Sequence, residues 1–365
     1  MPFVSKHAVR KWGLRVGALI VFAFFLGGCV GSPKRASAPI DPPPLDTVAV
    51  KGEDTGRMGD AVDDVARSES GAAESKATMT QKVLYVIDAH GYVVPLTVKI
   101  PYADGIAKQV LSYMVAGGPG ETLIPTGFRL PIPAGTKVDV DVREDHRAVV
   151  DFSKAFASYD PGDELKIMQA VIWALTEFPT IERVELRLNG QPLSAMPVQG
   201  TPLPASLTRA IGLNVELSPE AVPGQTSAVM LYFEAESADG TFRYFVPVTR
   251  LIPRTADIAT AAVTELIKGP HPGSPLVATV MPNAEVHRVQ VEGERVMADV
   301  SADLLGPEPK RTALRAALAA ALTLLSSTKA QGVQLLINGK PIKVGEMLDL
   351  TQPVSKPKSI NPLVF

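Results

Sequence analysis

Short runs of apolar and polar residues follow one another in the same order twice along this chain. In the first series, apolar stretches at 83–87 and 92–100 and alternation at 138–142 and 148–152 predict four strands. Apolar residues three or four positions apart predict two amphipathic helices among them. The helix faces are formed by Ile106, Val110, Leu111 and Met114 in the first and by Leu165, Met168, Ile172 and Leu175 in the second.

The second series repeats this plan closer to the C-terminus. Strands are predicted at 229–233 and 241–250, and one helix face is formed by Leu314, Leu318, Leu322 and Leu325. Each series closes on an Asn-Gly pair, and Asn338 follows Asn189 by 149 positions (338 − 189). Asn-Gly supplies the positive φ angles of a two-residue hairpin turn. The repetition indicates two copies of one domain.

Strands mixed with two amphipathic helices predict an α+β fold in which the helices cover one face of a sheet, a two-layer sandwich. We assign the domains to residues 82–200 and 227–350, with a linker at 201–226 and a C-terminal tail at 351–365. Copies of roughly 110 to 120 residues are long enough to bury a core each.

Residues 1–28 have the pattern of an export signal. They hold four basic and no acidic side chains, and an apolar run at 16–26 leads into Leu26-Gly27-Gly28-Cys29. The run is shorter than the roughly 20 residues that span a bilayer, and its flanks fit a secretory signal peptide. The last four residues resemble the bacterial lipobox, so we predict cleavage before Cys29 and its lipidation by diacylglycerol. A single cysteine excludes an intrachain disulfide.

Residues 29–81 are predicted to form a disordered tether. From Val30 to Gln81 the chain has no aromatic residue and is rich in Pro, Ala, Ser, Gly and acidic residues, too little apolar surface to offset the entropy of ordering. A flexible coil of about 50 residues would reach roughly 40 Å. Without the signal peptide the chain holds 32 basic and 38 acidic residues, a formal net charge of −6. This balance argues against binding to nucleic acid or anionic lipid headgroups.

Candidate catalytic and metal-binding residues do not form a repeated constellation. Of the five histidines, the four beyond the signal peptide occupy non-equivalent places in the two copies: His90, His146, His271 and His287. No paired-histidine or His-Cys spacing suggests a metal site. A triad of His146, Asp151 and Ser153 has no matching histidine in the second copy. We therefore predict a protein that is not an enzyme and holds no cofactor or metal.

An Asp-x-Ser motif recurs at 151–153 and 299–301, each time at the end of a predicted strand. Short polar side chains at such places bind free backbone N–H groups of caps and turns. We interpret the motif as structural.

With its lipobox, tether and two repeats, the chain resembles the GerM family of sporulation and germination lipoproteins, which carry tandem GerMN domains. The resemblance rests on Gly-Pro at 118–119 and 269–270, Pro133 and Pro282, the Asp-x-Ser motifs and the closing Asn-Gly-x-Pro. It implies a βαββαβ fold similar to the ring-building motif of secretion-system proteins. It also implies a non-catalytic role in endospore formation and germination, assembling the channel complex between mother cell and forespore.

The expected partners are the lipid bilayer, through Cys29 on the extracytoplasmic face of the cell membrane, and sporulation channel proteins. A strand edge or an apolar face of each domain would serve for binding. The alternative function is a cell-wall-associated lipoprotein that binds or hydrolyses peptidoglycan. Oligomeric state stays open, since the fold analogy suggests a ring and the differing copies equally allow a monomer.

Replacing Cys29 with Ala removes the thiol that would take the lipid, so Cys29→Ala should release the protein from membranes. Fractionation of cells followed by immunoblotting measures this. Persistence of the variant in the membrane fraction would refute the lipid anchor.

Overall fold

The computed structural model describes residues 78–306, 311–344 and 348–363, all within a compact unit that spans Ala72–Phe365. The signal peptide, Cys29 and the predicted tether as far as residue 77 lie outside the described residues. Lipidation and the tether therefore stay predictions, and the two repeats can be compared with the sequence.

The first repeat begins at Met79, within the last residues of the segment predicted as tether. Its strands are β1 (Met79–Ile87), β2 (Val93–Pro101), β3 (Val138–Val142), β4 (Arg147–Phe152), β5 (Arg183–Leu188) and β6 (Gln191–Pro192). Its helices are α1 (Ile106–Tyr113) and α2 (Glu164–Leu175), with 3-10 turns η1 (Pro119–Leu123), η2 (Lys154–Ala157) and η3 (Pro161–Asp163).

The connecting segment contains η4 (Arg209–Ile211) and β7 (Glu216–Leu217). The strands of the second repeat are β8 (Thr226–Glu236), β9 (Arg243–Pro253), β10 (Val286–Glu292), β11 (Arg295–Val300), β12 (Gly332–Ile337), β13 (Lys343–Val344), β14 (Leu348–Asp349) and β15 (Val354–Ser355). Its helices are α3 (Ile258–Lys268) and α4 (Arg311–Ser327), with the turn η5 (Ala302–Leu305).

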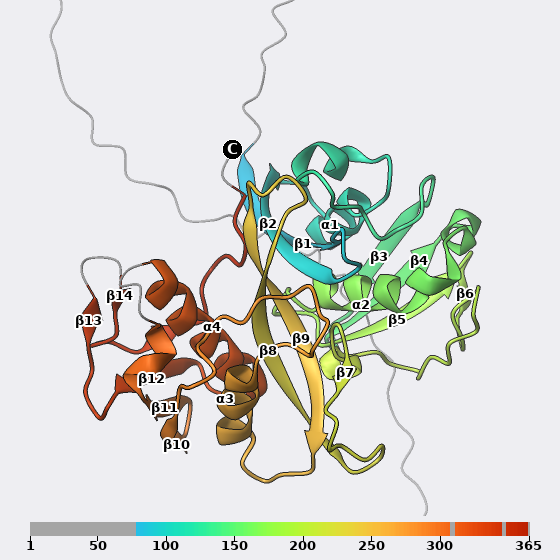
Figure 1. Cartoon of the computed structure of the whole chain (residues 1–365). Coiled ribbons are helices and arrows are strands. Elements are labelled where there is room, and N and C mark those ends of the chain that lie inside the picture. Colours follow the sequence, from blue (N-terminus) through green and yellow to red (C-terminus); the bar gives the residue numbers. More distant parts are fainter. Residues whose placement is uncertain (1–77, 307–310, 345–347, 364–365) are drawn as a thin grey trace, which may run out of the picture. The chain divides into compact units, whose positions relative to one another are not determined.

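Both repeats are built from a long hairpin, two helices and a mixed sheet. The hairpins are β1–β2 and β8–β9, and the sheets have the orders β3-β4-β5-β6 and β10-β11-β12-β15. In each sheet one central pair is parallel, β4 with β5 and β11 with β12. The helices lie between the hairpin and the sheet (Figure 1). The predicted α+β fold is confirmed, and the hairpin adds a layer of its own.

The helix cores follow the predicted spacing only in part. On α2, Met168, Ile172 and Leu175 are buried as expected, but Leu165 is 48% exposed. α2 is buried on all sides from Ile167 to Leu175, and only its first turn, which includes Leu165, reaches solvent. On α4 the buried positions are largely alanines, and Leu314, Leu318 and Leu325 are only partly buried.

The predicted Asn-Gly turns are present in both repeats. Asn189 and Gly190 have φ angles of 48° and 78°, and Asn338 and Gly339 have 51° and 77°. Leu188 pairs with Gln191 directly across the first turn. Two successive positive φ angles define the type I′ turn of a two-residue hairpin loop.

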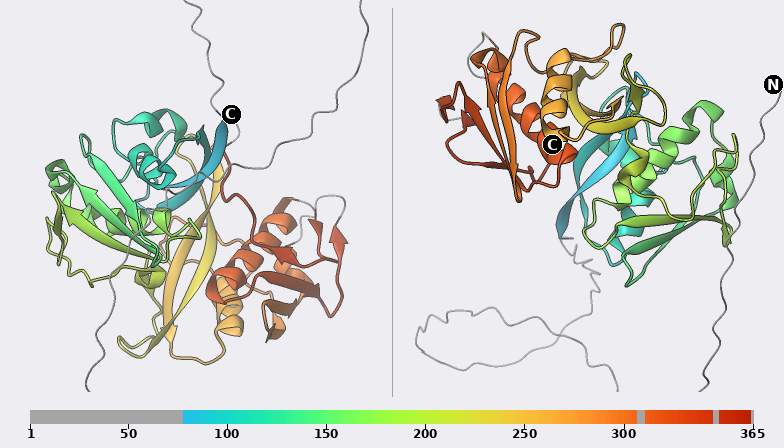
Figure 2. Two further views of the ribbon diagram at one scale, coloured as in Figure 1. Left: turned by 180° about the vertical axis from the view of Figure 1, so that it is seen from behind. Right: turned by 90° about the horizontal axis from the view of Figure 1, so that it is seen from below.

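The repeats are joined at β2 and β9, which lie side by side (Figures 1 and 2). Each of these strands has one edge that is not paired within its own hairpin. Thr249 N on β9 donates to Leu213 O, from the segment after the first repeat, and β7 then pairs with β9 in parallel. Thr97 N on β2 donates to Asn361 O, from the segment after the second repeat. Each repeat therefore completes the hairpin of the other.

Asn214 ties the two hairpins together through its side chain. Its amide donates to Val93 O on β2 at 2.8 Å and to Pro247 O on β9 at 2.7 Å. Its oxygen accepts from Val93 N at 2.8 Å.

Asn361 makes the equivalent bonds from the other side. Its amide donates to Pro95 O at 2.9 Å and to Phe245 O at 2.8 Å, and its oxygen accepts from Phe245 N at 2.7 Å. Both asparagines have a φ of 50°, a conformation that Asn adopts more readily than most residues. We call Asn214 and Asn361, with these six bonds, the asparagine clasp. Its two members lie in the segments predicted as linker and tail.

The asparagine clasp should dominate the stability of the junction. Asn361→Ala leaves buried backbone groups without partners and keeps the costly φ, so we expect the free energy of unfolding to fall by about 3 kcal/mol. The matched control is Asn189→Ala, at an exposed turn with nearly the same φ, which should cost only about 1 kcal/mol. Chemical denaturation measures both, and equal losses would contradict the role of the clasp.

Candidate functional site

The structure does not assemble a triad from His146, Asp151 and Ser153. His146 precedes β4, whereas Asp151 and Ser153 lie at its far end. The Asp151 carboxylate accepts from Gly190 N at 2.9 and 3.0 Å, and Ser153 Oγ accepts from Lys137 N at 2.9 Å. Both side chains are occupied by backbone groups.

The second repeat makes the same bonds. Asp299 accepts from Gly339 N at 2.7 Å, and Ser301 Oγ accepts from Glu285 N at 3.0 Å. The aspartate thus holds the Asn-Gly turn, and the serine holds the residue that enters the edge strand. The backbone-binding interpretation of Asp-x-Ser is confirmed, but neither serine caps the 3-10 turn that follows it.

The remaining histidines are dispersed. His271 Nε2 lies 3.7 Å from Glu216, and His287 Nδ1 lies 3.7 Å from Asp299. Within residues 78–306, 311–344 and 348–363, no group of three or more metal-ligating side chains comes together. In the same part of the chain, no helix combines the length and apolarity needed to cross a membrane.

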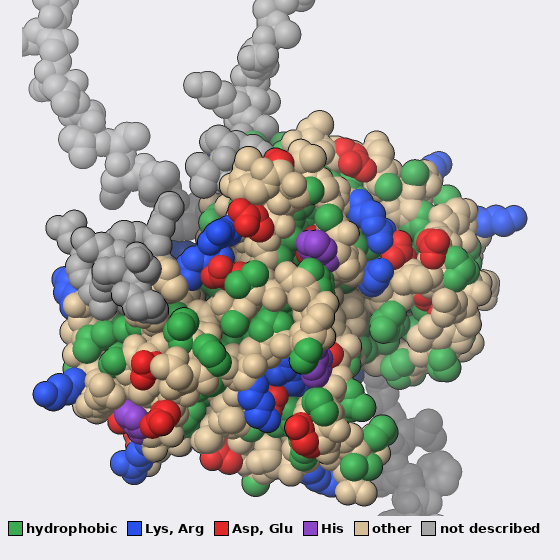
Figure 3. All heavy atoms as spheres, viewed as in Figure 1, with side chains coloured by type: hydrophobic (Ala, Val, Ile, Leu, Met, Phe, Trp, Pro, Cys, Tyr) green, Lys and Arg blue, Asp and Glu red, His purple; other side chains and the backbone are tan. Residues whose placement is uncertain are grey.

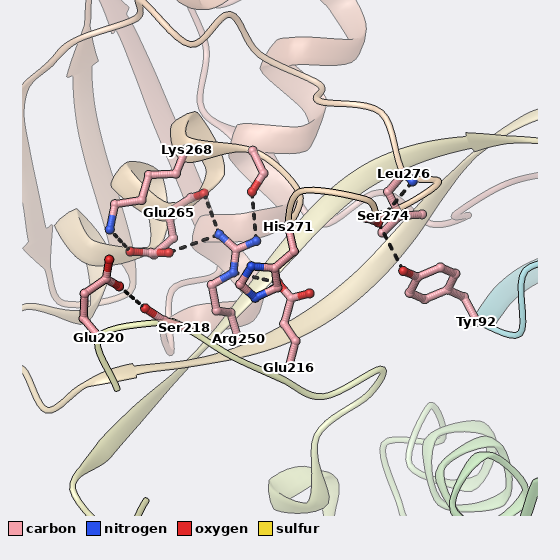
Figure 4. Close-up of polar contacts among 11 residues, drawn as sticks. Tyr92, Glu216, Ser218, Glu220, Arg250, Glu265, Lys268, His271, Ser274 and Leu276 are labelled. Carbon is pink, nitrogen blue, oxygen red and sulfur yellow. Dashed lines mark hydrogen bonds and ion pairs between the residues drawn. The ribbon is translucent and has the colours of Figure 1, made fainter. Parts of the chain in front are cut away.

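The densest polar cluster surrounds Arg250 on β9, where the connecting segment meets α3 (Figure 4). Arg250 is 3% exposed. Its Nε binds Glu216 at 2.6 Å, its Nη1 binds the Glu265 carboxylate at 3.1 Å, and its Nη2 donates to Gly269 O at 2.8 Å. The guanidinium is fully engaged, so it anchors β7 and the C-terminal end of α3 to the hairpin.

A cavity of about 160 Å³ borders this cluster and is lined by Ser218, Glu220, Lys268 and His271. Lys268 Nζ binds Glu265 at 2.6 Å, and Ser218 Oγ donates to Glu220. The charged and hydroxyl groups around the cavity bind one another, so they form an ion-pair network. Nearby, Tyr92 of the first hairpin lies within hydrogen-bond distance of Ser274, at 3.2 Å (Figure 4).

The first repeat has no such network. Counting from Pro95 and Pro247, which occupy the same hairpin position, Arg250 corresponds to Val98. Counting from the Gly-Pro pairs, Glu265 corresponds to Met114. Val98 and Met114 are both buried. The same fold therefore has an apolar core at this place in one repeat and a buried ion pair in the other.

A second cavity, of about 310 Å³, opens at the junction of the repeats and is lined by residues including Trp173, Arg209, Ser326 and Lys356. Arg209 Nη2 binds Glu177 at 2.6 Å, and its guanidinium lies 4.4 Å from the Trp173 ring centre. Burial raises the pKa of Glu177, but Arg209 and Lys356 outweigh it and hold the pKa below its usual value. Glu177 is therefore an ionised structural partner at the junction.

Among the described residues, Glu164 at the start of α2 is the carboxylate with the most hydrogen bonds. It accepts from Tyr159 Oη at 2.8 Å and from the backbone of Val198, Gln199 and Thr201 at 2.7 to 3.1 Å. Burial raises its pKa, but bonds from Thr201, Gln199 and Tyr159 lower it to about 2. It stays ionised at neutral pH and fixes the loop, so it is unsuited to act as a general acid.

On the face shown in Figure 3, acidic and basic side chains are interspersed and apolar side chains lie between them. No single-sign patch occupies that face. Such a mixed surface suits contacts with another protein through shape and local charge pairs.

Sequence patterns did not identify Asn214, Asn361 or Arg250. The sequence holds one weak signal, an apolar residue seven positions before each asparagine, Leu207 before Asn214 and Val354 before Asn361. The structure shows that these two residues are equivalent, because Leu207 pairs with Val184 and Val354 with Val333. The repeat thus extends beyond the Asn-Gly turn into segments of low similarity.

Comparison with known proteins gives a consistent result. The family model described as "Germane: Sporulation and spore germination" matches residues 83–194 and 230–343. The chain is 35% identical over 364 residues to the spore germination protein GerM of Bacillus subtilis (strain 168), covering 97% of this chain and 99% of that protein. The solved tandem GerMN domains of that protein match with a TM-score of 0.71 and 36% identity, over 78% of this chain and 99% of theirs. The resemblance seen in the sequence is confirmed.

The contrast between the repeats yields a test of the Arg250 network. Arg250→Val removes the bonds of Arg250 to Glu265 and Glu216 and leaves the buried Glu265 carboxylate with Lys268, so it should lower the free energy of unfolding by about 3 kcal/mol. Arg250→Val with Glu265→Met installs the first repeat's apolar pair and should recover most of that loss. Urea denaturation of both variants measures this; a double variant as unstable as the single one would contradict the argument.

Proposed function

This chain belongs to the Germane family of sporulation and spore germination proteins, and from that membership we propose that it is a non-catalytic, membrane-anchored scaffold. It acts in endospore formation and germination. In this proposal, the lipid on Cys29 fixes the chain outside the membrane, and residues 30–77 separate the anchor from the two repeats. The repeats help to assemble the channel complex between mother cell and forespore.

Family membership over both repeats supports the role in sporulation and germination. The engagement of the repeated polar residues supports the non-catalytic part. Asp151, Ser153, Asp299 and Ser301 all bind backbone N–H groups. Side chains used in this way hold turns and strand ends, and they are not free to act on a substrate.

The architecture also suits a scaffold. Because the asparagine clasp fixes β2 to β9, the two repeats present their sheets in a defined relation within one unit. In each sheet the first strand is an edge strand, β3 in one repeat and β10 in the other. Edge strands with open backbone groups are common docking places for other chains.

Deletion of the gene in its spore-forming host should lower the yield of heat-resistant spores, because the channel complex would not assemble. Wild-type chain supplied in trans should restore the yield, and Cys29→Ala should not, since it lacks the anchor.

The purified protein, incubated with murein sacculi, should release no muropeptides. Normal sporulation without the gene, or muropeptide release, would contradict the proposal.

A further inference from the structure

The two sheets each leave an edge strand without a partner in the described part of the chain. β3 bonds only to β4, and β10 bonds only to β11. β10 lies at the outer edge of the second repeat's sheet (Figure 1). The two strands occupy equivalent places, so differences between them show what each edge can bind.

The register of β10 decides which backbone groups face outward. Ser301 N donates to Glu285 O, so the backbone of Ser301 points toward the edge strand. Every second residue of β11 counted back from Ser301 points the same way, and on β10 the partners of these residues follow a bulge after Val286. Arg288, Gln290 and Glu292 then bond to β11, and the N–H and C=O groups of Val289 and Val291 point away from the sheet. Val291 is 53% exposed.

The sequence of this edge, Arg288-Val289-Gln290-Val291-Glu292, is complementary to itself in antiparallel orientation. When two copies pair in antiparallel orientation about Gln290, Arg288 of each copy lies opposite Glu292 of the other, which gives two opposite-charge pairs. The same pairing also sets Val289 opposite Val291 and joins the outward backbone groups of both strands. Neither Arg288 nor Glu292 has an ion-pair partner among the described residues, so both charges are available.

The equivalent edge in the first repeat is less suited to this pairing. Asp139 pairs with Asp151 as Arg288 pairs with Asp299, so Asp141 is the counterpart of Gln290, and self-pairing about it would set Asp141 against Asp141 of the other copy. Like charges directly opposite each other destabilise a strand pair. Both aspartates already have partners within the chain, Lys108 and Arg143.

We propose that the β10 edge binds the β10 edge of a second copy of this chain, giving a two-fold symmetric pair with one continuous sheet. A shared strand of five residues buries less surface than a typical stable dimer, so the association is weak in dilute solution. A two-fold contact uses the same patch on both copies and closes at two, which leaves both β3 edges free for other proteins.

Disulfide trapping tests the register. In a full chain with Cys29→Ser, Gln290→Cys places two thiols opposite each other at a non-hydrogen-bonded pair, where Cβ atoms lie about 4.5 to 5.5 Å apart. Mild oxidation should give a covalent dimer. The matched control is Arg288→Cys on the same exposed edge, whose thiol the proposed register sets opposite Glu292 of the other copy, so it should give little dimer. Dimer formation no faster for Gln290→Cys than for Arg288→Cys would overturn the proposal.

Charge exchange tests the complementarity. Arg288→Glu sets two pairs of like charges against each other and should weaken self-association about tenfold in sedimentation equilibrium. Arg288→Glu with Glu292→Arg restores both opposite-charge pairs and should return the affinity to that of the unmodified chain. A double variant that stays as weak as the single one, or an unmodified chain that is monomeric at all concentrations, would overturn the proposal.

Pairing at β10 rests on the proposed scaffold role, and an experiment can contradict the pairing without contradicting that role. A chain with Arg288→Glu that no longer self-associates but restores spore yield in the deletion strain would leave the sporulation role intact. It would show only that pairing at β10 is not needed for it.

Discussion

A strand at the edge of a hairpin must find partners for its backbone N–H and C=O groups, and this requirement decides how the two repeats are joined. β2 and β9 are such strands, and each is completed by the segment that follows the other repeat. Asn214 and Asn361 then bond to both hairpins at once. Because the exchange is reciprocal, neither repeat has its full set of backbone partners without the other.

The two repeats keep one fold while differing in the chemistry of their interiors. Val98 and Met114 are buried in the first repeat where the second has Arg250 and Glu265. A buried ion pair adds little net stability compared with apolar packing. Its bonds to Glu216 and Gly269, however, fix where the connecting segment and the end of α3 lie. The charged interior of the second repeat therefore helps to hold the junction between the repeats, and the first repeat has no corresponding bonds at Val98 and Met114.

The edge strands show a similar divergence at the surface. On β3 the aspartates face outward and are paired locally, which discourages contact between identical strands. On β10, Arg288 and Glu292 have no ion-pair partner within the part of the chain that the structure describes; they flank Val289 and Val291 and favour such contact. Duplication gave the chain two equivalent edges, and different side chains on them allow different partners. This difference suits a scaffold, since β10 can pair with β10 of a second copy while β3 stays available to other proteins.

The strands, the helix spacing, the Asn-Gly turns and the backbone role of Asp-x-Ser were predictable from sequence, because each depends on residues close together or on a visible repeat. Leu165 was misplaced because apolar spacing does not show how far along a helix the rest of the protein covers it, and the first turn of α2 reaches solvent. The asparagine clasp and the Arg250 network were decided only by the tertiary structure. Their partners are distant in the chain, as Asn361 is from Pro95. A hydrogen bond between distant residues leaves no periodic trace, so only the folded chain reveals it.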